Sequence, residues 1–219
     1  MPKIRILVIN PVGHSRWDES DARIYRSYAS PDTEIIVRSL PRGPETVETL
    51  EAYLEAEREV IKLGLELYKD FDAIIVNCFL DPGVRELRKR IGRQTIVVGP
   101  AEASLSIARF YGKPAVITVG AVKESVDLVR ERIKSLGFDV EVRGIPVSVM
   151  DIEKDKDKTL KYLAEESLKA RFAGADLIVL GCTGLAGMAD ELSKRIDMPV
   201  IDPAWASIKI AETLVLMKR

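Results

Sequence analysis

The sequence predicts an α/β protein built from two similar lobes, each with a four-stranded parallel sheet flanked by helices. Two observations support this prediction. Short β-branched segments alternate with amphipathic helical segments along the 219 residues, and two blocks of sequence recur at a nearly constant spacing. We expect a pseudo-two-fold relation between the lobes, with a cleft between them. The predicted lobes comprise residues 1–97 with 200–219, and residues 98–199.

The predicted strands are short segments rich in Ile and Val. Most of them are continuous apolar runs, which is typical of parallel strands covered by helices on both faces. In chain order they span residues 4–10, 34–40, 73–77, 95–98, 115–119, 139–145, 177–180 and 200–201. We therefore expect four strands in each half of the molecule.

The predicted helices lie between these strands, where apolar residues recur with the 3.6-residue period of an amphipathic helix. They span residues 18–29, 45–68, 82–91, 101–111, 123–136, 158–172, 186–196 and 204–217. A regular alternation of strand and helix indicates parallel strands with helical crossovers.

An internal repeat indicates that the two halves are related. Residues 72–78 read Asp-Ala-Ile-Ile-Val-Asn-Cys, and residues 176–182, which lie 104 positions later, read Asp-Leu-Ile-Val-Leu-Gly-Cys. Residues 98–108 and 201–211 share Pro, Ala, Ala, Ser, Ile and Ala at an offset of 103. Two matches in the same order at nearly the same offset predict a duplicated fold.

Composition narrows the possible partners and location. The 33 basic and 34 acidic residues give a net charge of −1, which argues against a nucleic-acid partner. No segment approaches the roughly 20 apolar residues of a membrane span. The N-terminal segment lacks a signal-peptide pattern, so we expect a cytoplasmic protein. Only two Asn and one Gln occur among many charged residues, a composition typical of thermophilic proteins.

The two cysteines, Cys78 and Cys182, occupy equivalent places in the repeat. Each follows a predicted strand and precedes a glycine-containing loop and a helix. Ligands of open parallel sheets bind beyond the carboxyl ends of the strands. Two such lobes facing each other would place the cysteines on opposite walls of one cleft.

Two facing thiols can invert a stereogenic carbon without a cofactor. A thiol has a pKa of about 8.5, and a helix N-terminus lowers it toward neutrality. A thiolate on one face of the carbon would remove a proton, and a thiol on the other face would return one. No glycine-rich nucleotide-binding motif is present, and a single His with this Cys spacing fits no metal site. We therefore expect neither a cofactor nor a metal.

Several local motifs make the sequence similar to the aspartate/glutamate racemase superfamily, most of all to its hydantoin racemase branch. The resemblance covers essentially the whole chain, and residues 78–83 are its most specific part. The motifs are Val-Ile-Asn-Pro at 8–11, Cys-Phe-Leu-Asp-Pro-Gly at 78–83, Val-Gly-Pro-Ala-Glu-Ala at 98–103, Gly-Cys-Thr-Gly-Leu-Ala-Gly-Met at 181–188 and Pro-Val-Ile-Asp at 199–202.

The resemblance implies a cofactor-independent racemase of five-substituted hydantoins in which Cys78 and Cys182 act as acid and base. It also implies a small-molecule substrate and a homo-oligomer. Residues of the first strand end, its counterpart in the second lobe and the positions after each cysteine would line the cleft. These expected substrate-binding residues are Asn10, Pro11, Phe79, Thr118, Val119, Gly120, Thr183 and Gly184.

Differences from the motifs of the amino-acid racemases favour a neutral ring as the substrate. Those enzymes carry Cys-Asn-Thr-Ala and Gly-Cys-Thr-Glu, where this chain has Cys-Phe-Leu-Asp at 78–81 and Gly184. The polar groups that would bind an amino-acid carboxylate and ammonium are therefore largely missing. The alternatives left open are an aspartate, glutamate or allantoin racemase, a related two-cysteine isomerase, and a ligand-binding protein without catalysis.

Several conspicuous residues have structural interpretations beside functional ones. Asn10 could cap the turn before Pro11, and Asn77 would point away from Cys78 on a regular strand. Asp81 could be the N-cap of the helix that follows it. His14 could lie at the rim of the cleft, and the charged segment 153–158 could be a solvated loop or a cover for the cleft.

Overall fold

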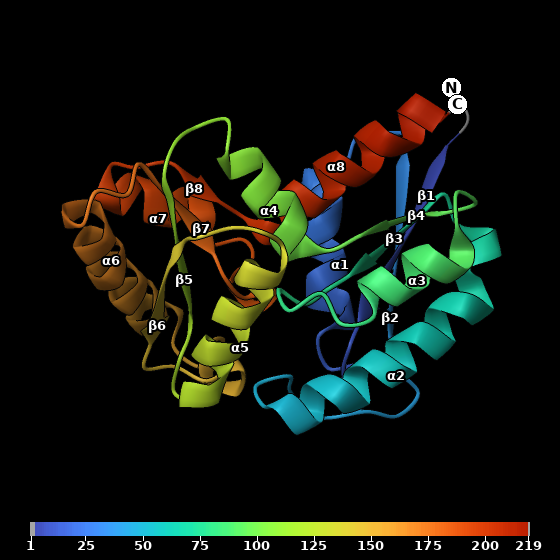
Figure 1. Cartoon of the computed structure of the whole chain (residues 1–219), viewed down its shortest axis with the longest axis horizontal. Helices are drawn as coiled ribbons and strands as arrows, with labels where there is room; N and C mark the ends of the chain where they lie inside the picture. The colour runs from blue at the N-terminus through green and yellow to red at the C-terminus, as the bar shows by residue number, and fades with distance from the viewer. Residues whose placement is uncertain (1–2, 219) are drawn as a thin grey trace.

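Each half of the chain forms one four-stranded parallel sheet in the computed structural model, which describes residues 3–218 (Figure 1). The strand order is β2-β1-β3-β4 in the first sheet and β6-β5-β7-β8 in the second, the same topology twice. The strands are β1 (Ile4–Asn10), β2 (Thr33–Ser39), β3 (Ala73–Val76), β4 (Ile96–Val98), β5 (Pro114–Val119), β6 (Glu141–Ile145), β7 (Leu177–Leu180) and β8 (Val200–Ile201). The predicted fold class is confirmed.

Helices cover both faces of each sheet. They are α1 (Asp18–Tyr28), α2 (Leu50–Leu67), α3 (Val84–Ile91), α4 (Pro100–Ala108), α5 (Lys123–Ser135), α6 (Lys156–Phe172), α7 (Ala189–Ile196) and α8 (Pro203–Lys218). Short 3₁₀ turns occur at Tyr68–Asp70, Val149–Asp151 and Thr183–Leu185. Among residues 3–218, no helix combines the length and the apolar character needed to cross a membrane.

Strand side chains alternate between two cores. In the first sheet, Leu7 and Ile9 pack with α2 and α3, whereas Ile6 and Val8 face α1 and α8. The second sheet is built alike, with α6 and α7 on the outer face and α4 and α5 on the inner face. Burial on both faces explains why the strands read as continuous apolar runs.

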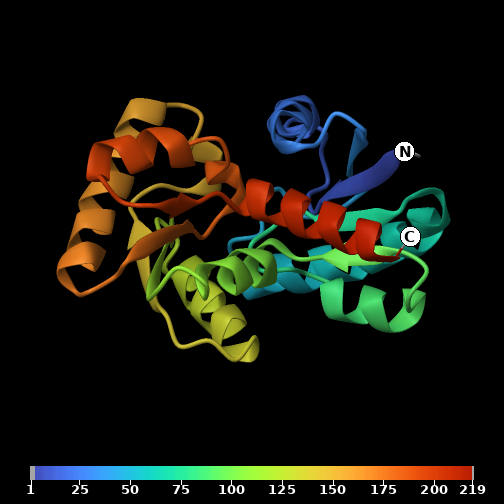
Figure 2. The same cartoon turned by 90° about the horizontal axis from the view of Figure 1, so that it is seen from above.

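The chain crosses between the sheets at α4 and α8 (Figure 2). After β4 it enters α4, which contacts β7, and after β8 it enters α8, which contacts β3 and β4. The predicted lobe boundaries fall beside these crossings. Strand pairing, however, places Val98 in the first sheet with Ile75, and Val200 and Ile201 in the second sheet with β7.

Most element boundaries differ from the prediction by one or two residues, but α2 and α7 begin later than expected. The predicted helix 45–68 begins at Leu50, because Thr49 accepts a hydrogen bond from the Ala52 N–H and caps it. The segment before it forms a loop that reaches the second lobe, where Glu48 binds the Val149 N–H. In the second lobe, a 3₁₀ turn at Thr183–Leu185 delays α7 to Ala189.

Candidate active site

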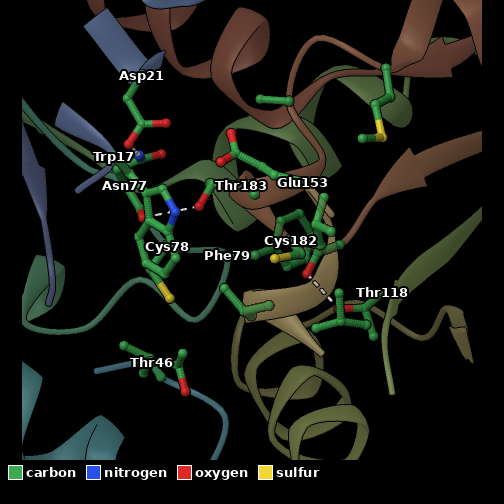
Figure 3. A pocket seen from close by; sticks show the side chains of 18 of the residues that line it. Trp17, Asp21, Thr46, Asn77, Cys78, Phe79, Thr118, Glu153, Cys182 and Thr183 are labelled. Carbon is green, nitrogen blue, oxygen red and sulfur yellow. Dashed lines mark hydrogen bonds between the residues drawn. The ribbon is translucent and has the colours of Figure 1, made fainter. Parts of the chain in front are cut away.

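A cavity of about 600 Å³ lies between the lobes at the carboxyl ends of the central strands. Asn10 ends β1, and Thr118 and Val119 lie at the end of β5. Cys78 and Cys182 follow β3 and β7, and both line the cavity. Figure 3 shows the two cysteines entering this space from the two lobes.

The backbone around the two cysteines repeats as the sequence does. The Cys78 sulfur accepts a hydrogen bond from the Leu80 N–H, and the Cys182 sulfur accepts one from the Gly184 N–H, in each case two residues further on. The N–H of Leu185 donates to the Cys182 carbonyl oxygen at 3.1 Å and also lowers the pKa of the Cys182 thiol. These donors favour a negative charge on sulfur.

Burial nevertheless dominates the acidity of both thiols. It raises the pKa of Cys78 to about 12, and the nearby Cys182 raises it further while the Leu80 N–H opposes the change. Burial likewise raises the pKa of Cys182 to about 12, with Glu48 adding to the effect. The expectation that helix N-termini lower these pKa values is therefore wrong, because desolvation outweighs the N–H donors. Both thiols are neutral in the free protein near neutral pH.

Most of the expected substrate-binding residues lie at the cavity. Its lining includes Asn10, Pro11, Phe79, Thr118, Val119, Thr183 and Gly184. Gly120 is not among the lining residues. A Cβ atom at Gly120 would lie 2.8 Å from the Gly144 Cα, so this glycine instead allows the ends of β5 and β6 to approach closely.

The two asparagines organise the wall on the first-lobe side. The side-chain amide of Asn77 donates to the side-chain amide oxygen Oδ1 of Asn10 at 2.7 Å, and its own Oδ1 accepts from the Tyr25 hydroxyl at 2.8 Å. Asn10 in turn donates to Asp18 at 2.9 Å. This network joins β1, α1 and the end of β3. Both amides line the cavity, although much of their hydrogen-bonding capacity is used within the protein.

Thr118 and Thr183 also use their hydroxyl groups to hold the strand ends. The Thr118 hydroxyl donates to the Gly181 carbonyl oxygen at 2.8 Å within the second lobe. The Thr183 hydroxyl donates to the Asn77 carbonyl oxygen at 3.0 Å across the two lobes. The dashed lines of Figure 3 mark these contacts, which fix the loops that follow both cysteines.

Sequence reasoning missed several residues that line the cavity. These are Trp17, Asp21, Thr46 and Glu48, among others, whereas Glu153, which also lines the cavity, lies in a segment that the sequence had singled out. Asp21 lies in the acidic first turn of α1, where the sequence offers no sign that it is half-buried at the cavity. Glu153 belongs to the charged segment 153–158, for which a role as a cover of the cleft was one of the two interpretations.

Asp81, His14 and the Glu102 of the motif at 98–103 lie outside the cavity lining. Asp81 does not cap α3, which begins after Gly83; its carboxylate accepts from the N–H groups of Ala101 and Glu102 at the start of α4. Glu102 forms an ion pair with Arg88 at 2.6 Å. His14 packs its ring edge against Trp17 at 4.7 Å between centroids. Within residues 3–218, no three His, Cys, Asp or Glu side chains cluster as a metal site would require.

Comparison with known proteins identifies the family. The model of the Asp/Glu/Hydantoin racemase family matches residues 6–211. The chain belongs to this family. As an Asp/Glu/Hydantoin racemase family member it is an isomerase of the racemase type, with a small-molecule substrate. The expected superfamily is therefore confirmed.

Relatives within and around the family share nearly the whole length. A hydantoin racemase of a Pseudomonas species (strain NS671) is 32% identical, over 97% of this chain and 86% of the relative. A hydantoin racemase of Paenarthrobacter aurescens is 31% identical, over 98% of this chain and 92% of the relative. The crystal structure of an allantoin racemase from Pseudomonas fluorescens superposes with a TM-score of 0.90 at 29% identity, over 98% of this chain and 92% of that chain.

Proposed function

We propose that this racemase inverts the ring stereocentre of a five-substituted hydantoin without a cofactor, using Cys78 and Cys182 as the two proton-transferring groups. The observation that carries the proposal is that both cysteines follow equivalent strands and line one cavity. The stereogenic carbon of a hydantoin lies between a carbonyl and a nitrogen, so its proton is acidic enough for a thiolate to remove.

In the proposed reaction one cysteine enters as thiolate and the other as thiol. The thiolate takes the proton from the ring carbon, and the electron pair moves onto the neighbouring carbonyl as an enolate. The opposite thiol then donates its proton to the other face of the carbon and becomes the thiolate. Burial supports this role, because a thiolate whose conjugate acid has a pKa of about 12 is a strong base.

The charge of the cavity favours a neutral ring over a free amino acid. Among the described lining residues the only cation is Lys156. Five carboxylates line the same space, namely Asp21, Glu48, Glu153, Asp157 and Glu191. They would repel the carboxylate of aspartate or glutamate. Allantoin, a hydantoin ring with a ureido substituent, remains a second candidate, supported by the similarity to the allantoin racemase structure.

Replacing each cysteine by serine tests the mechanism. We expect Cys78→Ser and Cys182→Ser each to abolish racemisation of both enantiomers, measured by circular dichroism of the substrate. In deuterated water each single variant should still exchange the ring proton of one enantiomer, and the two variants should differ in which one. Far-UV spectra control for folding. Racemisation by the double variant would refute the two-thiol mechanism.

A substrate panel tests the substrate. We expect racemisation of hydantoins and none of aspartate or glutamate. Comparing the rates with allantoin and with other five-substituted hydantoins decides between these two candidate substrates. Activity on the amino acids alone would contradict the proposal. The cytoplasmic location, the homo-oligomeric assembly and the thermophilic character stay predictions.

A further inference from the structure

The cavity carries negative charge that the protein itself does not neutralise. Asp157 and Glu191 both pair with Arg195, at 3.7 Å and 2.5 Å. The other three lining carboxylates, Asp21, Glu48 and Glu153, form no salt bridge with any of residues 3–218.

Glu48 is the most deeply buried of these three. Only 6% of its surface is exposed, and one carboxylate oxygen accepts a hydrogen bond from the Val149 N–H at 3.1 Å. Its charge raises the pKa of Cys182, so it acts within the reaction cavity. Buried carboxylates in proteins are normally paired with a cation, because an unpaired charge in a low-dielectric space is unfavourable.

Asp21 and Glu153 approach each other from opposite lobes. Asp21 lies on α1, and Glu153 lies in the loop before α6; Figure 3 shows their carboxylates turned toward the same space. Asp21 accepts a hydrogen bond from the Asn77 amide at 3.1 Å. Burial raises the pKa of Asp21 to about 7, and the charges of Asp18 and Glu153 contribute. Two carboxyl groups that face one cavity from opposite lobes favour a cation between them, because a cation stabilises the ionised form of both.

We propose that the cavity selects hydantoins whose ring substituent ends in a cation, an ammonium or a guanidinium group, and that Asp21 and Glu153 bind this cation from the two lobes. The inference rests on the proposed hydantoin racemase function. Once the ring lies between the thiols, its substituent extends within the same cavity, and its positive end supplies the missing partner of the carboxylates. Lys156, the one cation of the lining, leaves most of the negative charge unbalanced.

The test compares hydantoins whose substituents match in length and differ in charge. We expect kcat/KM for the aminobutyl compound to exceed that for its neutral isostere, the pentyl compound, by about tenfold, as for a charge-assisted hydrogen bond. The carboxypropyl compound should react slowest. Added salt should reduce the preference, because Glu153 is exposed and its charge is screened. Enzyme-free racemisation of each compound is subtracted.

Variants that remove one carboxylate charge show which residue causes the preference for a cationic substituent. We expect Glu153→Gln to lower the ratio of aminobutyl to pentyl kcat/KM at least about fivefold, because a charge-assisted contact becomes a neutral one. Glu165→Gln is the matched control, since Glu165 is an exposed carboxylate on α6 outside the cavity lining, and it should leave the ratio unchanged.

The outcomes separate this inference from the proposed function. If the pentyl compound is racemised and the aminobutyl compound is no better, the inference fails while the function stands. It also fails if allantoin, a neutral N–H donor, is preferred over the aminobutyl compound and Glu153→Gln changes nothing. If the folded protein racemises no hydantoin at all, both are overturned.

Discussion

The thiol groups of Cys78 and Cys182 are held in a form that is rarely ionised but strongly basic once ionised. Each sulfur is half-buried at the cavity and accepts an N–H from the residue two positions later, Leu80 or Gly184. These donors stabilise a thiolate, while loss of water destabilises it. The balance favours the neutral thiol, so we expect ionisation of one cysteine to limit the rate of reactions that need a thiolate.

The alkylation rate measures this balance at the residue scale. Because the pKa of both thiols is raised to about 12, we expect their reaction with iodoacetamide to accelerate about tenfold per pH unit up to about pH 10. The same chain unfolded in guanidinium is the control, and its cysteines should level off near about pH 9. A plateau at that pH in the folded protein would contradict the raised pKa values. Mass spectrometry of each cysteine-containing peptide gives the two rates.

Asp21 makes stability depend on pH with a defined sign. Its folded pKa is about 7 and its unfolded pKa is near 3.8, so the folded state binds more protons between these values. Its favourable contribution is complete below the unfolded pKa and is lost as pH rises through the folded pKa. Asp21→Asn mimics the protonated form. We expect this variant to gain about 2 kcal/mol more stability over the wild type at about pH 8 than at about pH 5.

Urea unfolding at the two pH values measures this difference. A gain from Asp21→Asn that is equal at both pH values would show that the carboxylate is ionised throughout, against the raised pKa. Glu19→Gln, a change at an exposed carboxylate of the same helix, is the control and should have little pH-dependent effect.

At the scale of elements, the two crossing helices are capped in the same place by carboxylates of different origin. Asp202 accepts from the N–H groups of Ala204 and Trp205 at the start of α8. At the equivalent site of α4 the chain has Gly99, and the carboxylate of Asp81 occupies the space instead. A Cβ atom at Gly99 would lie 2.4 Å from the Asp81 Cγ.

This arrangement predicts a specific effect of substitution at Gly99. We expect Gly99→Ala to lower the free energy of unfolding by about 1–3 kcal/mol, because the added methyl collides with a carboxylate that also pairs with Arg132. Thermal and urea unfolding give the value. An unchanged stability would mean that Asp81 moves aside without loss.

Exchanging Asp81 and Gly99 tests whether a carboxylate at either position can cap α4. Asp81 has a φ of 51°, so Asp81→Gly removes the cap without backbone strain. We expect the double change Asp81→Gly with Gly99→Asp to recover part of the stability lost in Asp81→Gly, because it copies the local cap of α8. A double variant no more stable than the single one would refute the equivalence.

At the scale of the whole molecule, the lobes share one core. Its members include Ala101 of α4, Ala204 and Ile208 of α8 and strand residues of both sheets. The interface also holds polar contacts, such as the Arg132–Asp81 ion pair at 2.8 Å and the Tyr28–Asp202 hydrogen bond at 3.0 Å. Helix α4 follows the first sheet in the chain but packs on the second, and α8 follows the second sheet but packs on the first. We therefore expect the lobes to unfold together.

Unfolding experiments test this coupling. We expect far-UV circular dichroism and tryptophan fluorescence to give coincident transitions, and Ile208→Ala to lower the free energy of unfolding by about 2–5 kcal/mol without splitting them. Ile208 is fully buried, at 0% exposure. Leu216→Ala, on the exposed side of the same helix, is the control with a small effect. Two separate transitions would show that the lobes are independent.

The sequence by itself determined the architecture and identified the two cysteines that we propose as the proton-transferring pair. Continuous apolar runs and 3.6-residue periods depend on neighbours in the chain, so β1, β7 and most helices could be located within a few residues. The repeat then placed Cys78 and Cys182 at equivalent strand ends, and the motifs indicated the family that the comparisons confirm.

Only the tertiary structure decided how the site is charged. Residues far away in the chain set the direction of the thiol pKa values and of the Asp21 pKa, and they bury Glu48. They also hold Gly120 against Gly144 and let Asp81 cap α4. Desolvation and Coulomb interactions act through space, so no local pattern reports them. The sequence shows which side chains can react, and the packing around them determines whether they are ionised.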